Sequence, residues 1–490
     1  MEVKVQVSKE FVVETLSKIV GDRNVVVDIK ELEPYSKDDS FVKPIMPLCV
    51  VKPVAIEEVQ EVVRFANQYK IPITPTSSGP NNLGGTIPSP DGLVIDLRNM
   101  NRVLDIDYRA WMASVEPGVT FSQLQSIVNK EGLRVLTPSE NPASSSVLST
   151  YLDLVPLYGW VYYGEENLTT MTVVLPNGDL VKTGEAAFPE MHHPYMHSHA
   201  SPLAGLMNYM WYQSQGTLGI VVQGWIKLKP KGEMEKVYFI PIDDAKDLQG
   251  ILRAIMWLRY PRDMAVLNKQ DFALMFAESS PKCYPEKVRE LREVLPNWVI
   301  MFSLRGRAEA VEVMESDLKK LGEERSFKLV DEICGITSEM ALSEIATPSG
   351  FTKWRNYKGA RNIIPFIASI KDVPAIYKEV LKISEKLRYP KDDVGVTIIP
   401  TDRIGVVACS ISFARDPTSQ ENTDLVKKVY VESAKALLDL GAFYSRPYGL
   451  LSSLIYSRCQ TYYEVLLDIK RVIDPNNIMN PRRLQFGGDD

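Results

Sequence analysis

Apolar and polar positions along the chain follow the two periods that are typical of helices and strands. Residues 56–69 have apolar side chains at positions 56, 59, 62, 63, 66 and 69, which predicts a helix with one buried stripe. The short apolar runs 48–51 and 71–74 on either side predict strands, so we expect residues 48–75 to form a β-α-β unit. The other elements expected before residue 230 are helices over 11–20 and 120–132, strands over 24–29, 92–97, 102–107 and 112–115, a hairpin over 171–181, and a strand that reaches residue 228.

A second set of elements begins near residue 232 and contains two similar strand–helix–strand halves. This alternation predicts an antiparallel sheet with helices on one face, an α+β domain. The strands are expected over 237–242, 298–304, 327–331, 363–370, 395–400 and 404–413, and the helices over 243–258, 308–321, 373–387 and 423–440. A helix over 462–473 follows, and the irregular segment 474–481 after it could return to the first domain.

Two loops between these elements are rich in small polar residues. The first loop, residues 72–85, contains Gly, Ser, Thr and Asn between two expected strands, and residues 137–146 have a similar composition. Glycine allows the backbone to come close to a ligand, and successive free N–H groups form a concavity that holds phosphate. The alternative is a surface turn between two strands, because glycine-rich loops are common.

Composition and charge exclude several classes of protein. With 490 residues, at roughly 100–200 residues per domain, two or three domains are expected. The hydrophobic share of 45% and the net charge of −6 indicate a globular protein without the basic surface of a nucleic-acid-binding domain. No apolar run approaches the length of a membrane span, and no apolar signal segment precedes the polar residues 8–10. The five cysteines are far apart and form no C-x-x-C pair, which favours reduced thiols and a cytoplasmic location.

All four histidines lie within residues 192–199. Any histidine-based catalysis or metal binding must therefore come from this segment. It has no accompanying cysteines, and Pro194 keeps it irregular, so a pH-sensitive or interface loop is favoured over a metal site. No metal ligand is therefore predicted.

Six motifs occur in a fixed order: 51–60, 74–85, 115–120, 174–178, 216–221 and 474–481. Together they resemble the FAD-linked oxidase family of vanillyl-alcohol oxidase and p-cresol methylhydroxylase, which also contains glycolate and D-lactate dehydrogenases. The resemblance implies a two-domain α+β flavoprotein. Residues 1–230 would form a p-cresol methylhydroxylase-type FAD-binding domain to which residues 441–490 return, and residues 231–440 an antiparallel-sheet cap for the substrate.

In this family FAD lies extended, so the resemblance implies that its diphosphate contacts the backbone of residues 76–82 and its isoalloxazine lies between the domains. Cys409 lies in an expected strand, and we predict that it is a core residue and not a site residue. The cofactor-binding residues implied are Thr76, Ser77, Ser78, Gly79, Pro80, Asn81, Asn82, Gly84, Pro117, Gly118, Pro138, Ser144, Ser145, Ser149, Gly219, Ile220, Val221 and Asn480.

The chain departs from the family pattern where substrate and flavin attachment are decided. Histidine, which tethers FAD in many members, is confined to 192–199, so non-covalent FAD is expected, with a tyrosyl or cysteinyl link left open. The cap strand 396–401 lacks the metal-binding histidines of the hydroxy-acid dehydrogenases. Leu83 and Ser445 stand where phenol-oxidising members have tyrosine.

Three residues are candidates for catalysis: Arg446, which aligns with a family arginine, Tyr444 beside it, and Tyr163 in a segment that resembles one near the flavin. Arg446 could bind an anionic substrate or anchor the domain interface. Tyr448 is a further candidate donor to a substrate oxygen. Buried interface tyrosines are common, so a structural role stays open for each tyrosine.

The resemblance implies an FAD-dependent oxidoreductase that transfers a hydride from a small organic substrate, aromatic and anionic ones included, to flavin N5. The electrons would then pass to dioxygen or to an electron-acceptor protein, and a homo-oligomer is expected. One alternative is a 2-hydroxy-acid dehydrogenase subunit of an electron-transfer complex. Another is a catalytically degraded flavin-binding or structural subunit.

Overall fold

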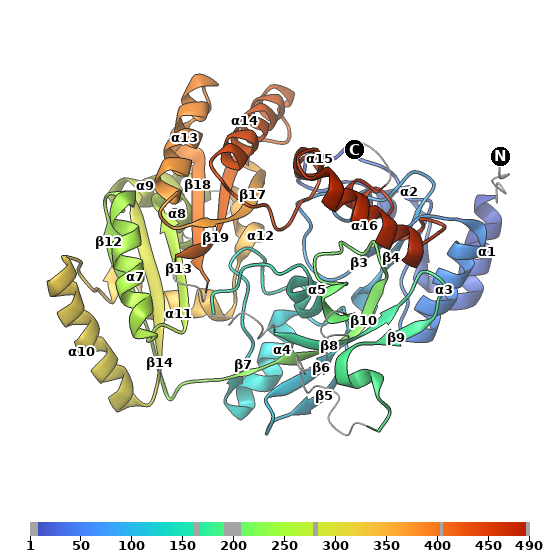
Figure 1. Ribbon diagram of the computed structural model, residues 1–490, viewed down its shortest axis with the longest axis horizontal. Coiled ribbons are helices and arrows are strands. Elements are labelled where there is room, and N and C mark those ends of the chain that lie inside the picture. Colours follow the sequence, from blue (N-terminus) through green and yellow to red (C-terminus); the bar gives the residue numbers. More distant parts are fainter. Residues whose placement is uncertain (1–7, 160–166, 191–206, 278–282, 402–404, 487–490) are drawn as a thin grey trace.

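The computed structural model describes residues 8–159, 167–190, 207–277, 283–401 and 405–486 (Figure 1). The chain forms two small sheets in its N-terminal half and one large sheet between residues 234 and 415. This mixture of helices and antiparallel sheets confirms the predicted α+β class. Within the described ranges, no helix is long and apolar enough to cross a membrane.

The first sheet has four strands in the order β1 (Val25–Val26), β2 (Val50–Val51), β4 (Leu93–Asp96) and β3 (Ile73–Thr76). Both β2 and β3 pair in parallel with β4, so the predicted β-α-β unit is present and β4 lies between its strands. Its helix, α3 (Ile56–Tyr69), buries the predicted apolar stripe against the sheet and α1 (Lys9–Val20). The strand predicted over 24–29 is only β1, because the Asp28 side chain caps a helix, α2 (Ile29–Ser36), that the pattern missed.

The second sheet is antiparallel and has five strands. Their order is β5 (Val103–Asp107), β6 (Met112–Val115), β10 (Ile220–Lys227), β8 (Leu168–Val174) and β9 (Leu180–Lys182). Two helices pack on it: α4 (Phe121–Val128), capped by Thr120, and α5 (Val147–Leu152), capped by Ser146. Two further strands of two residues each, β7 (Leu133–Arg134) and β11 (Lys229–Pro230), pair to form a short ribbon. This ribbon connects the second sheet to the large sheet.

The large sheet is antiparallel throughout. Its order is β12 (Met234–Ile242), β14 (Trp298–Gly306), β13 (Asp263–Asn268), β18 (Val394–Pro400), β19 (Val406–Arg415) and β17 (Ala360–Ser369). The strand predicted over 327–331 is absent; Val330 forms only an isolated bridge to Phe239.

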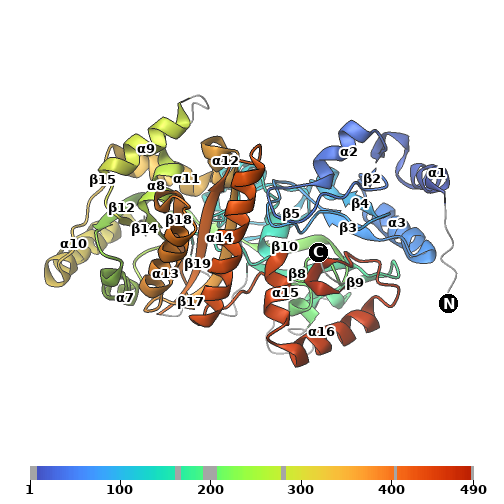
Figure 2. The ribbon, with the colours of Figure 1, turned by 90° about the horizontal axis from the view of Figure 1, so that it is seen from above.

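Helices cover both faces of this six-stranded sheet, so the prediction of helices on one face is wrong (Figure 2). The pattern missed the second layer because its helices are short. One face carries α7 (Leu248–Leu258), α10 (Ala308–Arg325), α13 (Val373–Lys386) and α14 (Gln420–Asp439); the other carries α8 (Lys269–Phe276), α9 (Tyr284–Val294), α11 (Ser338–Ala346) and α12 (Gly350–Lys358).

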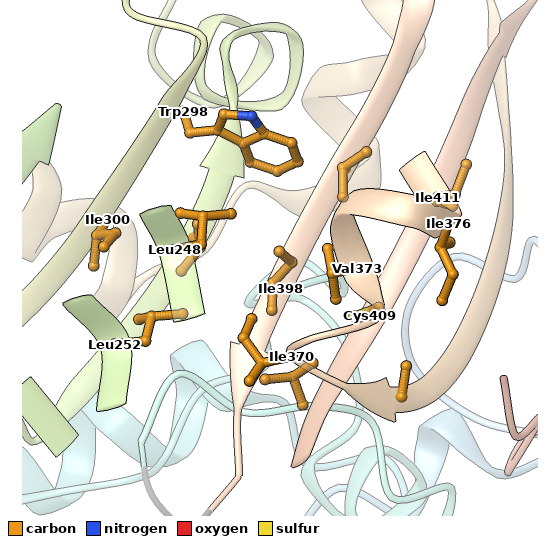
Figure 3. Close-up of a cluster of buried hydrophobic side chains, with 14 of the residues drawn as sticks. Leu248, Leu252, Trp298, Ile300, Ile370, Val373, Ile376, Ile398, Cys409 and Ile411 are labelled. Carbon is orange, nitrogen blue, oxygen red and sulfur yellow. The ribbon is translucent and has the colours of Figure 1, made fainter. Parts of the chain in front are cut away.

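Aliphatic side chains fill the space between the sheet and the first helix layer (Figure 3). Leu252 of α7 and Ile376 of α13 belong to this cluster together with sheet residues such as Ile398. Cys409 lies in the same cluster at 3% exposure, which confirms its prediction as a core residue. Burial raises the pKa of its thiol, so it stays protonated.

The C-terminal segment runs back across the first sheet. After α15 (Leu450–Tyr456) and α16 (Gln460–Ile473), the Ile73 N–H donates to the Ile478 carbonyl at 2.7 Å, and the Asn480 N–H donates to the Ile73 carbonyl at 2.8 Å. Buried Lys470 donates at 2.7 Å to the carbonyls of Thr217 and Met479, and at 2.5 Å to Asp474. Burial lowers the pKa of Lys470, although Asp474 opposes this. This clamp holds the tail against β3.

Candidate functional site

A deep cleft lies where the two small sheets, the C-terminal segment and the edge of the large sheet meet. The space between its walls is about 1350 Å³, including the part open to solvent. The loop after β3 (residues 75–86) forms one wall, and residues 140–155 and 211–221 form others. Ile363, Pro365, Arg446 and Tyr448 close the end that faces the large sheet.

The loop after β3 is fixed by contacts to the neighbouring loop. Gly79 has φ +106°, and a Cβ atom there would lie 2.7 Å from the Cα of Ser145. The Ser146 N–H donates to the Ser78 carbonyl at 2.9 Å, and the Ser78 hydroxyl donates to the Gly118 carbonyl at 2.8 Å. Only glycine fits at position 79, because any side chain there meets backbone. The loop is therefore held with its backbone close to the cleft.

Four buried polar atoms of residues that line the cleft have no hydrogen-bond partner within the described ranges. They are Asn82 Nδ2, Ser145 Oγ, Trp211 Nε1 and Gln215 Oε1. Unpaired buried polar atoms cost free energy, about 1–3 kcal/mol each, and are rare in native proteins. Their gathering around one cleft indicates that a polar ligand supplies the missing partners.

Most of the predicted cofactor-binding residues line this cleft. These are Thr76, Ser77, Ser78, Pro80, Asn81, Asn82, Pro117, Ser145, Ser149, Gly219, Ile220 and Val221.

The other six lie outside the lining. Asn480 holds the wall from behind, since its Nδ2 donates to the carbonyls of Gln215 at 2.7 Å and Gly85 at 3.1 Å. Ser144 is exposed, and Pro138 pairs with Leu157 in an isolated bridge. The remaining three are Gly79, Gly84 and Gly118, whose backbones shape the loops.

Arg446 lies in a cluster of charged groups at the large-sheet end of the cleft. It is 3% exposed, and its Nη2 lies 2.7 Å from Glu140 Oε2 while its Nη1 lies 3.6 Å from Asp153 Oδ2. The Tyr448 hydroxyl donates to Asp153 Oδ1 at 2.6 Å. Two carboxylates thus face one guanidinium, so the positive charge of Arg446 is already compensated inside the protein.

Burial and the neighbouring charges act in opposite directions on the protonation of this cluster. Burial raises the pKa of Asp153 above its ordinary value, and Arg446 and Tyr448 oppose this only in part. Burial acts to lower the pKa of Arg446, but Glu140 and Asp153 outweigh it and the pKa rises. Asp153 therefore takes up a proton more readily than an ordinary aspartate does.

Tyr444, one of the predicted catalytic tyrosines, does not join this cluster. It is buried in the core of the large-sheet half, and its hydroxyl donates to the Ala434 carbonyl at 2.7 Å. Tyr444 therefore lies outside the cleft lining, whereas Tyr448, the further candidate donor, lines the cleft. Tyr163 and the histidines of 192–199 lie outside the described residues.

A second pocket adjoins the first and shares Val155, Pro365 and Arg446 with it. It holds about 910 Å³, solvent-open space included, between residues 151–159 and strands β17, β18 and β19. Among the described residues of its lining, the side chains other than Arg446 are uncharged, and most are aliphatic or aromatic. Within the described residues, no cluster of His, Cys, Asp and Glu that could hold a metal ion was found.

Sequence reasoning missed Glu140 and Asp153 as site residues, although Glu140 lies in the second polar loop. Neither belongs to a motif, and only the fold brings them to Arg446. Gly85 was also missed as a packing position: a Cβ atom there would lie 2.7 Å from a ring carbon of Tyr448. Pairings such as Arg446–Glu140 and Tyr448–Asp153, which are 306 and 295 positions apart, leave no signal in a single sequence.

Comparisons with known proteins show what the chain is similar to. The FAD binding domain family matches residues 47–184. The chain is 28% identical to the flavoprotein subunit of 4-cresol dehydrogenase (hydroxylating) from Pseudomonas putida, over 96% of this chain and 94% of that protein. It is 22% identical to D-lactate dehydrogenase from Anaerostipes hadrus, over 96% of each chain.

The fold is also that of a solved structure of p-cresol methylhydroxylase with substrate bound. The TM-score is 0.82 at 21% identity, over 98% of this chain and 97% of that one. At this identity the likeness establishes the fold alone. Together with the FAD binding domain match and the full-length relatives, it confirms the predicted resemblance to the FAD-linked oxidases of the vanillyl-alcohol oxidase and p-cresol methylhydroxylase type, whose members are FAD-dependent oxidoreductases.

Proposed function

We propose that the cleft binds FAD without a covalent bond and that the adjoining apolar pocket binds the substrate. The observation that carries this proposal is the group of four unpaired buried polar atoms around a glycine-shaped loop. A diphosphate needs several directed N–H donors, which the backbone of residues 76–82 offers without a basic patch. Residues 1–230 with 441–490 would form the FAD-binding domain, and residues 231–440 the cap.

Bound in the cleft, FAD would supply a two-electron acceptor that takes a hydride from a substrate carbon. The chain's own residues would position the substrate and move its proton. We assign the proton-accepting role to Asp153, because it is a cleft-lining carboxylate held by Tyr448 and Arg446. Arg446 would act as a positioning residue that keeps Asp153 and Glu140 in place.

The charge balance of the site favours an uncharged, largely apolar substrate. An anionic substrate would need a free cation, whereas Arg446 already faces two carboxylates. The lining of the second pocket offers apolar contact instead. A neutral aromatic or alkyl compound with an oxidisable carbon fits this environment better than a 2-hydroxy acid. We propose dioxygen or an electron-acceptor protein as the final acceptor.

Anaerobic titration of the purified protein tests the substrate class. A panel of neutral alkylphenols and benzylic alcohols is compared with lactate and glycolate, and bleaching of the flavin absorbance is followed. We expect bleaching by at least one neutral aromatic compound and none by the hydroxy acids. Bleaching by lactate or glycolate alone would support a hydroxy-acid dehydrogenase and refute this substrate assignment.

The Asp153→Asn variant tests the proton acceptor. It keeps the shape of the side chain and the capacity to accept from Tyr448, so FAD binding should persist while the rate of flavin reduction falls by about 100-fold, within the range that general base catalysis contributes. The matched control is Asp179→Asn, in the exposed turn between β8 and β9. Equal reduction rates in Asp153→Asn and wild type would remove Asp153 from this role.

A further inference from the structure

A third concave site lies at the junction between the β7–β11 ribbon and the large sheet. It is called here the junction pocket, and the space within it is about 1190 Å³, including its open side. It is lined by Arg134, Leu136, Lys229, Pro230, Lys231, Gly232, Glu233, Arg259, Pro261, Arg262, Arg305, Gly306 and Arg307.

Three different segments bring cationic side chains to this pocket. Arg134 and Lys229 come from the paired strands of the ribbon. Arg259 and Arg262 follow the end of α7, and Arg307 stands between β14 and α10. Figure 1 shows the ribbon passing below the ends of β14 and α7, so the two halves of the protein meet here.

Two of the pocket arginines, Arg134 and Arg305, are held in place by ion pairs with carboxylates. Asp263 lies 2.9 Å from Arg134 Nη1 and 2.7 Å from Arg305 Nε, and Glu235 pairs with Arg305 Nη1. The Nε atom of Arg134 is buried and has no partner within the described part of the chain. Arg305 is 8% exposed and also lines the pocket. Neither Asp263 nor Glu235 is among the residues that line the pocket, whereas Arg134 and Arg305 are.

The other cationic residues of the lining form no such ion pairs within the part of the chain that the structure describes. No ion pair within the described ranges involves Lys229, Lys231, Arg259, Arg262 or Arg307. Glu233 is the single carboxylate of the lining. The whole chain carries a net charge of −6, so this concentration of positive charge runs against the overall balance.

Like charges gathered around a concavity repel one another, and a pocket of one sign concentrates counter-ions of the other. Guanidinium groups offer paired donors that match the oxygens of phosphate and carboxylate. We propose that the junction pocket binds a small oligoanion with two or more phosphate or carboxylate groups, which links the β7–β11 ribbon to the large sheet. The concave shape favours a small molecule over a flat macromolecular surface.

Isothermal titration of the FAD-loaded protein, in which the cofactor cleft is filled, tests this proposal. Tripolyphosphate and citrate are titrated separately at constant ionic strength, and chloride serves as the reference anion. Saturable binding of either supports the proposal, and the stronger of the two identifies phosphate or carboxylate as the preferred group. Absence of saturable binding by both anions overturns it.

The double variant Arg262→Gln with Arg307→Gln locates the binding site. It removes two charge-assisted contacts and should weaken binding at least about tenfold. The matched control, Arg23→Gln with Arg325→Gln, removes the same charge from exposed positions outside the pocket and should change binding by less than about twofold. Equal losses in the two variants would mean that net charge, and not this pocket, attracts the anion.

Arg259→Gly removes a pocket cation and is expected to leave the protein folded. Arg259 has φ +56° at the end of α7, a conformation that glycine adopts without strain. The unfolding midpoint of the ligand-free variant should therefore equal or exceed that of wild type, while the rise produced by the anion should shrink. An undiminished rise would show that Arg259 takes no part and would contradict the assigned pocket. Flavin content reads out the proposed cofactor function separately in every variant.

Discussion

The cofactor cleft and the large sheet differ in where their buried polar groups lie. In the sheet half, buried charges face one another: Arg361 pairs with Asp271, and Arg305 pairs with Asp263. This half also holds unpaired buried atoms, such as Gln270 Nε2 and Ser433 Oγ, but their residues do not line the cleft. The unpaired atoms of Ser145 and Asn82 belong to residues that line one cavity, where a ligand can supply the missing partners. Substitutions in the two regions should therefore have separable effects.

The largest expected effect is on stability alone, from Phe302→Ala in the large sheet. Phe302 is fully buried, so its truncation leaves a cavity and should lower the free energy of unfolding by about 3–5 kcal/mol. The FAD content per folded molecule should stay unchanged, as measured by denaturant unfolding and flavin absorbance. Val313→Ala, at a side chain 59% exposed on α10, is the control and should change stability by no more than about 0.5 kcal/mol. Loss of flavin from folded Phe302→Ala would break the separation.

The converse variant, Gly79→Val, should affect FAD binding most strongly. The new side chain would meet the backbone of Ser145 and push the loop away from the cleft. Loss of two hydrogen bonds to charged phosphate oxygens, at about 1.5–3 kcal/mol each, should weaken FAD binding by at least about 100-fold. Gly21→Val is the matched control: Gly21 also has positive φ, but a Cβ atom there has no neighbour within 4 Å. Equal FAD affinity in the two variants would remove the loop from the binding site.

A smaller effect is expected on the pH dependence of stability, through the ion pairs of Asp263 with Arg134 and Arg305 at the junction pocket. Burial would raise the pKa of Asp263, but Arg134 and Arg305 outweigh it and lower the pKa to about 2 from the ordinary 3.8. The pair therefore contributes about 2 kcal/mol above pH 3.8, which is lost as the pH falls through about 2. The stability difference between wild type and Asp263→Asn should accordingly shrink below pH 4.

Chemical denaturation between pH 6 and pH 2.5 measures this difference. Asp105→Asn, at an exposed carboxylate without an ion pair among the described residues, is the control and should show no such trend. A difference between wild type and Asp263→Asn that stays constant over this range would contradict the assigned ion pairs.

The smallest expected effect is on FAD affinity and comes from a single atom of the cleft wall. Ser145→Ala removes one of the four unpaired polar atoms from the cleft wall, the Ser145 hydroxyl. Because this hydroxyl has no partner in the free protein, stability without FAD should be unchanged or slightly higher. FAD affinity should fall by about fivefold, the equivalent of one hydrogen bond of about 1 kcal/mol. A destabilised free protein with normal FAD affinity would show that the hydroxyl serves the fold instead.

The sequence predicted the elements whose periodicity is local. Helix α3 and the loop after β3 were found because apolar spacing and glycine composition act over a few residues. The second helix layer was missed, since α8 and α12 are only 8 and 9 residues long and too short for a clear period. Tyr444 was expected at the substrate from its place two residues before Arg446; in the structure Arg446 lines the cleft, whereas the Tyr444 hydroxyl donates to the Ala434 carbonyl in the core, a contact that only the fold creates.

The visible absorbance spectrum of the purified protein, before and after acid precipitation, tests the central claim most directly. The account predicts a flavin spectrum in the native protein, with FAD released into the supernatant by acid, because the cleft holds the cofactor without a covalent bond. Flavin that stays in the pellet would contradict non-covalent attachment. A protein that contains no flavin and binds none when FAD is added would refute the assignment of the cleft.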